Sequence, residues 1–235
     1  MKLIEKKEDQ IAFSVEIDES LANAIRRYLN QIPICAIDEV EISKNDSPLY
    51  DEIIAHRLGL IPIKVDKNKK LPKISLSTKD EGIVYSKEFK GAEPVYKETP
   101  ITFLNKGQEL EIKAITKMGR GVEHSKFSPG LMFYRRVAEI VLDKEFKDEI
   151  KNNFPEHEIK EKGDKIVILD NKKQEIADVC EGMAKKKGKP TKMTFKDEVV
   201  VNLESFGQLS VDEIFKKSIE ELKKDLQKVS KKIGG

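Results

Sequence analysis

The sequence predicts an α+β protein, and two repeating patterns support this fold class. Apolar residues at every second position, as in 11–17 and 199–203, are typical of half-buried strands. Apolar residues three and four positions apart, in 21–32, 51–58 and 211–233, indicate amphipathic helices. With 235 residues, the chain is long enough to bury a core in one large domain or in two closely associated ones.

The composition narrows the classes of function. Lys and Arg number 44 against 42 Asp and Glu, so we expect no general attraction to nucleic acid and only an indirect role on DNA. No stretch approaches the roughly 20 apolar residues that cross a bilayer, and the N-terminal residues form no apolar signal core. We therefore expect a soluble, cytoplasmic protein that does not contact a membrane. Its two cysteines, Cys35 and Cys180, are too few for a disulfide framework and are expected as reduced thiols.

The first predicted strand, 11–17, leads into a helix that Asp18 or Ser20 is expected to cap and that Pro33 ends. The apolar face of this helix includes three residues at helical spacing: Leu21, Ile25 and Leu29. Arg26 and Arg27 flank that face. Two interpretations remain open for this pair, a solvated surface or contacts from their planar guanidinium groups to a partner protein.

A second helix is predicted after the strand 34–43. Asp51 is its expected N-cap, and Gly59 is expected to end it in a left-handed conformation. Glu52 and His56 lie one turn apart, which is compatible with a shared metal or proton. Because a metal site needs about three or more protein ligands, we favour the alternative. In that alternative Glu52 complements the helix dipole, while His56 and Arg57 bond to a neighbouring element or subunit.

The middle of the chain is predicted to be mainly β. Apolar residues at 101–104 and 110–115 surround the turn at 105–107, a pattern that predicts a β-hairpin. The stretch 119–130 contains glycines but lacks the Gly-Lys-Ser/Thr ending of a phosphate-binding loop, so we expect no nucleotide there. Residues 131–142 are expected to extend a sheet.

Residues 144–190 depart from the regular apolar pattern. A strand is expected at 166–169 and a helix near 174–184. The lysine-rich run 185–190 is expected to be a solvated loop, with weak contact to nucleic acid as the alternative, because no aromatic residues interleave with the lysines.

The C-terminal stretch predicts one long helix. Ser210 and Glu213 have the spacing of a capping box. Apolar residues then recur at steps of four and three: Val211, Phe215, Ile219, Leu222, Leu226, Val229 and Ile233. This seam is heptad-like, with lysines and glutamates outside it. It either packs on the chain's own sheet or meets a partner helix, and we favour the partner helix.

Two of these stretches resemble a known family. The first has the order Asn23-Ala24-Ile25-Arg26-Arg27, Asp51-Glu52 and Ala55-His56-Arg57-Leu58-Gly59-Leu60-Ile61-Pro62. The second is Gly-x-Gly-x-x-His-x-Lys-x-Ser-Pro from Gly119 to Pro129, with Phe127 where the family more often has Trp. Both are similar to the D subunit of archaeal DNA-directed RNA polymerase, whose family includes the N-terminal domain of the bacterial alpha subunit and its eukaryotic counterpart.

The resemblance implies a discontinuous plan. Residues 1–45 and 194–235 would form a dimerisation domain of sheet and helices, and residues 46–193 a mainly β insertion. Within the insertion, residues 144–190 would be a degenerate ferredoxin-like subdomain. Some relatives bind iron–sulfur clusters there, which requires about four thiolates. Because this segment supplies only Cys180, no cluster or other cofactor is expected.

The resemblance also implies the role of an assembly platform within DNA-directed RNA polymerase. The chain would pair with subunit L, bind the small subunits N and P, and dock the second-largest subunit. The pairing core would comprise the apolar residues Leu21, Ile25, Leu29, Phe215, Ile219, Leu222, Leu226 and Val229. Polar contacts to a larger subunit would come from Arg26, Arg27, Glu52, His56 and Arg57. No catalytic or metal-binding residue is expected, because the Mg²⁺ carboxylates of nucleotidyl transfer are expected on the large subunits.

Three alternatives to this role remain. One is a ferredoxin-like redox module, which the cysteine count disfavours. Another is a free-standing metal-dependent hydrolase that uses Glu52, His56 and His124. The last is a homodimer, as in the bacterial alpha subunit, which is a variant of the assembly role.

Overall fold

The structure is a computed structural model that describes residues 1–64 and 70–234. Its helices and strands confirm the α+β class. The chain divides into two compact units, each built from two separate stretches. The first unit comprises residues 1–26 and 132–204, and the second comprises residues 27–131 and 205–235.

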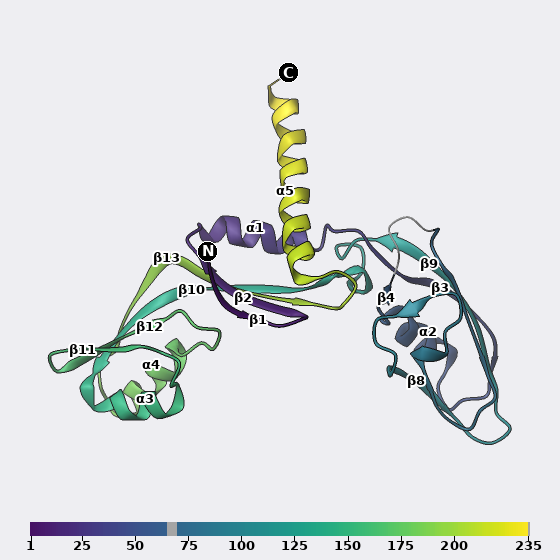
Figure 1. Ribbon diagram of the computed structural model, residues 1–235, viewed down its shortest axis with the longest axis horizontal. Coiled ribbons are helices and arrows are strands. Elements are labelled where there is room, and N and C mark those ends of the chain that lie inside the picture. Colours follow the sequence, from purple (N-terminus) through teal and green to yellow (C-terminus); the bar gives the residue numbers. More distant parts are fainter. Residues whose placement is uncertain (65–69, 235) are drawn as a thin grey trace. The chain divides into compact units, whose positions relative to one another are not determined.

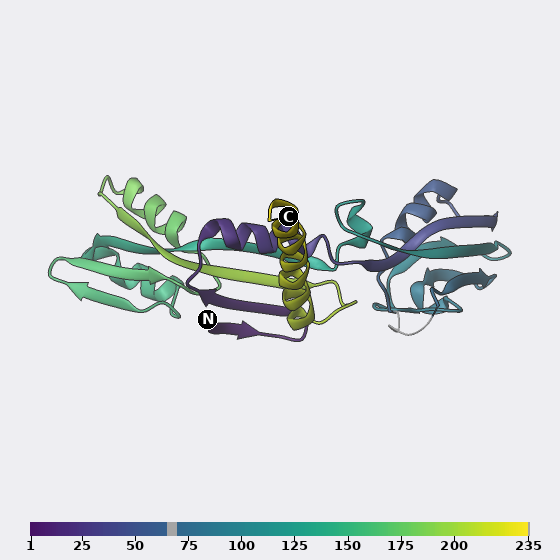
Figure 2. The ribbon, with the colours of Figure 1, turned by 90° about the horizontal axis from the view of Figure 1, so that it is seen from above.

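A six-stranded sheet forms the centre of the first unit. In spatial order, its strands are β1 (Lys2–Lys6), β2 (Gln10–Val15), β13 (Lys192–Ser205), β10 (Gly130–Asp143), β12 (Lys165–Asp170) and β11 (Ile159–Lys162). Figure 2 shows β1, β2, β13 and β10 side by side. The antiparallel pairing of β2 with β13 places Val15 opposite Val199 and thereby joins the two ends of the chain.

Two short helices cover the β10–β12–β11 end of this sheet (Figure 1). They are α3 (Lys147–Asn153), which follows a 3-10 turn at Lys144–Phe146, and α4 (Ala177–Lys186). Their buried side chains, including Phe146 and Ile150, pack with Ile168 of β12 in one apolar core. Cys180 of α4 lies in the same core.

The second unit contains a three-stranded antiparallel sheet. Its order is β3 (Ile34–Asn45), β9 (Leu110–Gly119) and β5 (Lys73–Thr78). Helix α2 (Asp51–Gly59) packs Ile54 and Leu58 into the core beside Leu76 and Ile112 of that sheet. Two small strand pairs complete the unit: β4 (Ile63–Lys64) with β7 (Glu93–Pro94), and β6 (Gly82–Tyr85) with β8 (Pro100–Leu104). Short 3-10 turns lie at Ser86–Glu88 and Ser125–Phe127.

Two further helices carry the residues that are predicted to form the pairing core. Helix α1 (Glu19–Leu29) begins after Asp18, whose carboxylate accepts a hydrogen bond from the Ser20 amide at 2.7 Å. It ends in tight turns before Pro33, as expected. Helix α5 (Val211–Ile233) is a single unbroken helix, as the seam predicted (Figure 1).

Three local predictions were wrong. The segments 101–104 and 110–115 do not form a hairpin, because β8 pairs with β6 while β9 pairs with β3 and β5. Gly59 is not left-handed, and Leu60 follows it as a C-cap in the right-handed region. Asp51 is not the N-cap of α2, which is Tyr50. The Asp51 carboxylate instead accepts a hydrogen bond from the Asn45 side chain at 2.8 Å.

The two compact units do not follow the expected boundaries at residues 45/46 and 193/194. Strands β10, β12 and β11 of the expected insertion join β1, β2 and β13 in one sheet. The two compact units reflect packing within the chain, whereas the expected domains were defined by their contacts with a partner. The discontinuous domain plan therefore stays a prediction.

Candidate assembly surfaces

The long helix α5 is anchored at its N-terminal end. The Ser210 hydroxyl accepts a hydrogen bond from the Glu213 amide at 3.3 Å, and the Glu213 carboxylate accepts one from the Ser210 amide at 3.2 Å. This capping box confirms the prediction. Val211, Ile214 and Ser218 are buried, so other parts of the chain cover one side of the first two turns.

Beyond Ser218 the apolar seam of α5 lies open. Ile219 is 39% exposed, Leu226 61% and Val229 52%, whereas Phe215 and Leu222 are half-buried. Exposed apolar residues that recur at helical spacing, rather than singly, mark an interaction surface. The structure thus brings five predicted pairing residues together on one helix.

Charged groups beside the seam are held by neighbours on the same unit. Lys228 Nζ lies 2.8 Å from Asp225 Oδ1, and the Tyr28 hydroxyl donates a hydrogen bond to Asp225 Oδ2 at 3.2 Å. The bond from Lys228 lowers the pKa of Asp225, while burial and the bond to Asp225 raise the pKa of Tyr28. Asp225 therefore ties the middle of α5 to the last turn of α1.

The predicted interface residues of α1 divide into two groups. Ile25 and Leu29 are buried, at 6% and 2% exposure, and are already covered within the chain. Leu21 is 43% exposed, and Arg26 and Arg27 are also exposed. Among the described residues, the Arg26 guanidinium donates a hydrogen bond to a local partner, the Asn23 side-chain oxygen, at 2.9 Å.

Helix α2 presents a second open surface. Glu52 and His56 are exposed and Arg57 is half-buried. Two apolar residues on the outer side, Ile53 and Leu60, are 44% and 49% exposed. The helix therefore offers polar groups flanked by apolar ones, a composition suited to protein contacts.

Neither α2 nor the rest of the described chain assembles a metal centre. Within residues 1–64 and 70–234, no three His, Cys, Asp or Glu side chains are grouped so as to hold a metal ion. His124, the third residue of the hydrolase alternative, uses its Nδ1 atom to accept a hydrogen bond from the Lys126 amide at 3.1 Å.

The glycine-containing loop 119–130 is held closely against the second unit. Phe127 is buried, and a Cβ atom on Gly119 would lie 2.5 Å from its ring. Lys126 lies 5.0 Å from the centre of the same ring, and its ammonium contacts Asp38 of β3 at 2.7 Å. The bond from Lys126 lowers the pKa of Asp38. The contacts of Phe127 with Gly119 and Lys126 thus fix the base of the loop.

Asn30, just after α1, forms the second attachment of this loop. Its side-chain oxygen accepts a hydrogen bond from the Ser128 hydroxyl at 2.9 Å, and its carbonyl accepts one from the Val122 amide at 3.3 Å. A Cβ atom on Gly121 would lie 2.5 Å from that side-chain oxygen. Sequence reasoning identified the loop but missed Asn30 and Asp38. The only signal for them in the sequence was their position, with Asn30 directly after α1 and Asp38 within β3.

The two cysteines are poorly suited to metal ligation. Both are free and buried. Burial, with a smaller contribution from the Asp170 charge, raises the pKa of Cys180 to about 11, and burial raises the pKa of Cys35. Because the thiolate is the form that binds metals, the protonated thiols are poor ligands at neutral pH.

The lysine-rich run 185–190 is exposed, as expected, but only residues 187–190 form a loop. Helix α4 continues through Lys186, and three of the lysines lie near carboxylates. Lys185 is 2.8 Å from Glu181, Lys187 is 3.7 Å from Glu149, and Lys189 is 3.4 Å from Asp143. Local ion pairs therefore engage part of the run's positive charge.

No helix among residues 1–64 and 70–234 combines the length and the apolar character needed to span a membrane.

A protein-family model and the sequences of known relatives both relate this chain to RNA polymerase subunits. Residues 40–133 match the family model of the RNA polymerase Rpb3/RpoA insert domain. DNA-directed RNA polymerase subunit Rpo3 of Methanocaldococcus jannaschii is 36% identical over 169 residues, which cover 70% of this chain and 86% of that protein. The Rpo3 subunit of Methanosphaera stadtmanae is 29% identical over 240 residues, which cover 89% of each chain.

A third relative is matched over a shorter stretch. The Rpo3 subunit of Pyrococcus horikoshii is 39% identical over 160 residues, which cover 61% of this chain and 62% of that relative. The chain therefore spans about six tenths of the length of this relative. The M. jannaschii protein combines 36% sequence identity with a match over 86% of its own length. The chain belongs to the family of DNA-directed RNA polymerase subunit Rpo3.

Proposed function

We propose that this chain is a non-catalytic assembly subunit of archaeal DNA-directed RNA polymerase and takes part in transcription only as a member of that enzyme. The open apolar seam of α5 carries the proposal. Ile219, Leu226 and Val229 are exposed on a helix whose other outward residues are mostly charged. Such a seam is stabilised when a partner helix covers it. The family assignment indicates which class of complex supplies the partner.

The proposed partner of α5 is subunit L, and the proposed heterodimer then binds the small subunits N and P. The α2 surface with Glu52, His56 and Arg57 would dock the second-largest subunit, together with Arg26 and Arg27. DNA would be contacted only indirectly, and the complex would work in the cytoplasm. In this proposal residues 1–45 and 194–235 act together as the pairing domain.

We propose no cofactor for this chain. Residues 144–190 contain one cysteine, whereas cluster ligation requires about four thiolates. Likewise, no observation favours the redox module or the hydrolase.

The first experiment measures the mass of the chain by light scattering, alone and after co-expression with subunit L. A stable one-to-one complex is expected. Changing Leu222→Asp and Leu226→Asp together should abolish the pairing, because two carboxylates would be buried in an apolar interface without partners. A double variant that still pairs fully would show that the seam is not the interface.

The matched control is Lys223→Asp with Gln227→Asp. Both positions are exposed on the same turns of α5 but lie outside the seam. This control should pair normally, and it should keep the thermal stability of the lone chain because both replaced side chains are exposed. A lone chain with twice the expected mass would instead indicate the homodimer.

A further inference from the structure

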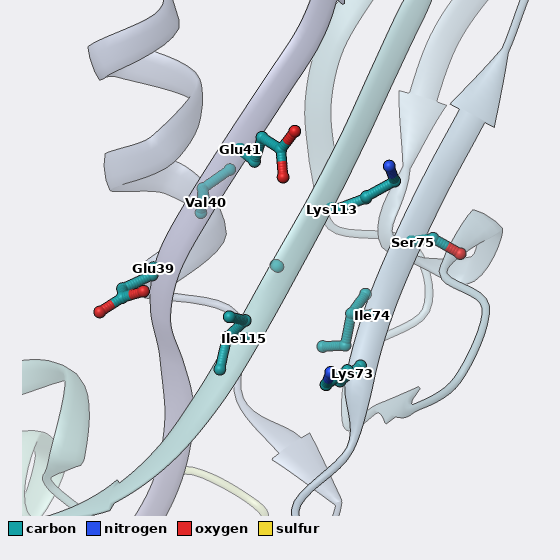
Figure 3. A pocket seen from close by; sticks show the side chains of 9 residues that line it. Glu39, Val40, Glu41, Lys73, Ile74, Ser75, Lys113 and Ile115 are labelled. Atoms are coloured by element: carbon teal, nitrogen blue, oxygen red, sulfur yellow. The ribbon is translucent and has the colours of Figure 1, made fainter.

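A groove crosses the outer face of the sheet β3–β9–β5 in the second unit (Figure 3). Glu39 and Glu41 of β3 line one side, Lys73 of β5 the other, and Lys113 and Ile115 of β9 lie between them. This surface is separate from α5 and α2.

The strand register orders these side chains into two rows. Ile115 lies opposite both Glu39 and Lys73. Lys113 lies opposite both Glu41 and Ser75. The acidic groups are therefore on β3 and the basic groups on β9 and β5. In the first row, the half-exposed Ile115 lies between the negative charge of Glu39 and the positive charge of Lys73.

The charged groups of the groove have no ion-pair partner within the part of the chain that the structure describes. Figure 3 shows the Lys113 side chain directed toward β5 and not toward Glu41. Nearby charges on the same sheet behave differently, because Asp38 contacts Lys126 at 2.7 Å and Lys117 at 3.8 Å. No described residue therefore competes with another molecule for the charges of the groove.

We propose that this groove binds an extended segment of a partner polypeptide whose alternate residues are basic, apolar and acidic. The basic residue would lie toward Glu39 and Glu41, the apolar residue on Ile115 and the acidic residue toward Lys73. Neighbouring strands lie about 4.8 Å apart, so the acidic and basic edges are separated by about 10 Å. Alternate side chains of an extended chain point to one side. The first and third of them lie about 13 Å apart, and the long charged side chains at the two edges accommodate the difference of about 3 Å. A small ligand fits less well, because the charges lie in rows and do not converge on one point.

The proposal rests on the proposed polymerase assembly as the source of the partner segment. The test places the photo-crosslinking residue p-benzoylphenylalanine at position 115 of the full chain. This chain is reconstituted with the other polymerase subunits and irradiated, and the crosslinked peptide is sequenced by mass spectrometry. The control probe replaces Ile83 on β6, which is 50% exposed, as Ile115 is. We expect a crosslink from position 115 to one segment with the basic–apolar–acidic pattern, and none to that segment from position 83.

Charge reversal tests whether the acidic edge selects the segment. Glu39→Lys together with Glu41→Lys should reduce the yield of this crosslink about tenfold, because attractive pairs become repulsive. The control, Glu81→Lys with Glu111→Lys, changes the net charge equally at exposed positions outside the groove and should leave the yield unchanged.

Three results would overturn the inference. They are an assembled polymerase without a crosslink from position 115, a crosslink to a second copy of this chain, and a crosslink to a segment without the charge pattern. A chain that never joins the other subunits would instead refute the proposed function. The two failures are therefore distinguishable.

Discussion

Arg135 shows how one residue organises the interior of the first unit. Its guanidinium lies 2.9 Å from Asp170 Oδ1 and also donates hydrogen bonds to the carbonyls of Asp170 and Lys172. The Asp170 carboxylate is fully buried, and His157 Nε2 lies 3.7 Å away. A buried carboxylate needs a charged or hydrogen-bonding partner. Arg135 therefore fixes the connection between β12 and α4.

Arg135→Met should reduce the free energy of unfolding by about 3–5 kcal/mol, because it leaves the buried Asp170 carboxylate without its cation. Urea denaturation of the full chain measures this loss. The control is Arg136→Met, since Arg136 is more exposed and lies 3.8 Å from the fully exposed Asp197. It should change stability by no more than about 0.5 kcal/mol. Equal losses in the two variants would contradict the role assigned to Arg135.

The cysteines support a second prediction at the residue scale. Because the pKa of Cys180 is raised to about 11, its thiol should remain protonated at neutral pH. We expect Cys35 and Cys180 to react slowly with Ellman's reagent in the native chain and rapidly after unfolding in urea. Chain refolded with iron and sulfide should show no cluster absorbance, and a chelator should not change its melting temperature. A chelator-sensitive brown protein would refute this expectation.

Helices and strands differed in how well the sequence predicted them. The start of α5 was predicted because Ser210 and Glu213 satisfy each other's backbone within one turn. The pairing of β9 was not predicted, because its partners β3 and β5 are distant in sequence and no turn residue specifies them. Local chemistry fixes the end of a helix, whereas strand pairing depends on the whole unit.

The contact between β11 and the start of α3 gives a pH-dependent prediction at the element scale. Glu161 of β11 lies 2.6 Å from Lys144 and 2.5 Å from Lys147, and these bonds lower the pKa of Glu161 to about 2. Because the pKa of Glu161 is lower in the folded state than in the unfolded chain, its charged form stabilises the fold at any pH above the unfolded pKa. That stabilisation disappears as the pH falls from about 4.5 toward 2.

Glu161→Gln should therefore melt at a slightly lower temperature than the unchanged chain at neutral pH, and the difference should shrink through this acidic range. The effect is small because the groups face solvent. Differential scanning calorimetry over a pH series measures it. The neighbouring Glu158→Gln serves as the control and should show no such narrowing. A constant difference at every pH would contradict the role of the two lysines.

At the scale of the whole molecule, the sequence predicted the exposure of the candidate assembly surfaces only in part. The open residues Leu226 and Val229 were recognised from the seam, since amphipathic spacing is visible in sequence. The burial of Ile25 and Leu29 was not predicted. Amphipathic spacing is the same for a helix face that a partner covers and for one that the chain itself covers. The groove around Ile115 was also missed, since it exists only when three separated strands align.

The pairing of β2 with β13 has a consequence for the order of biosynthesis. As the chain leaves the ribosome, β2 cannot pair along the edge that includes Val15 until β13, with Val199, has been synthesised. Strands β3 and β9 are both complete much earlier. Until β13 follows, this edge of β2 exposes backbone groups that favour aggregation. Helix α5 is translated directly after β13. The proposed pairing seam is therefore synthesised only after the last strand of the six-stranded sheet.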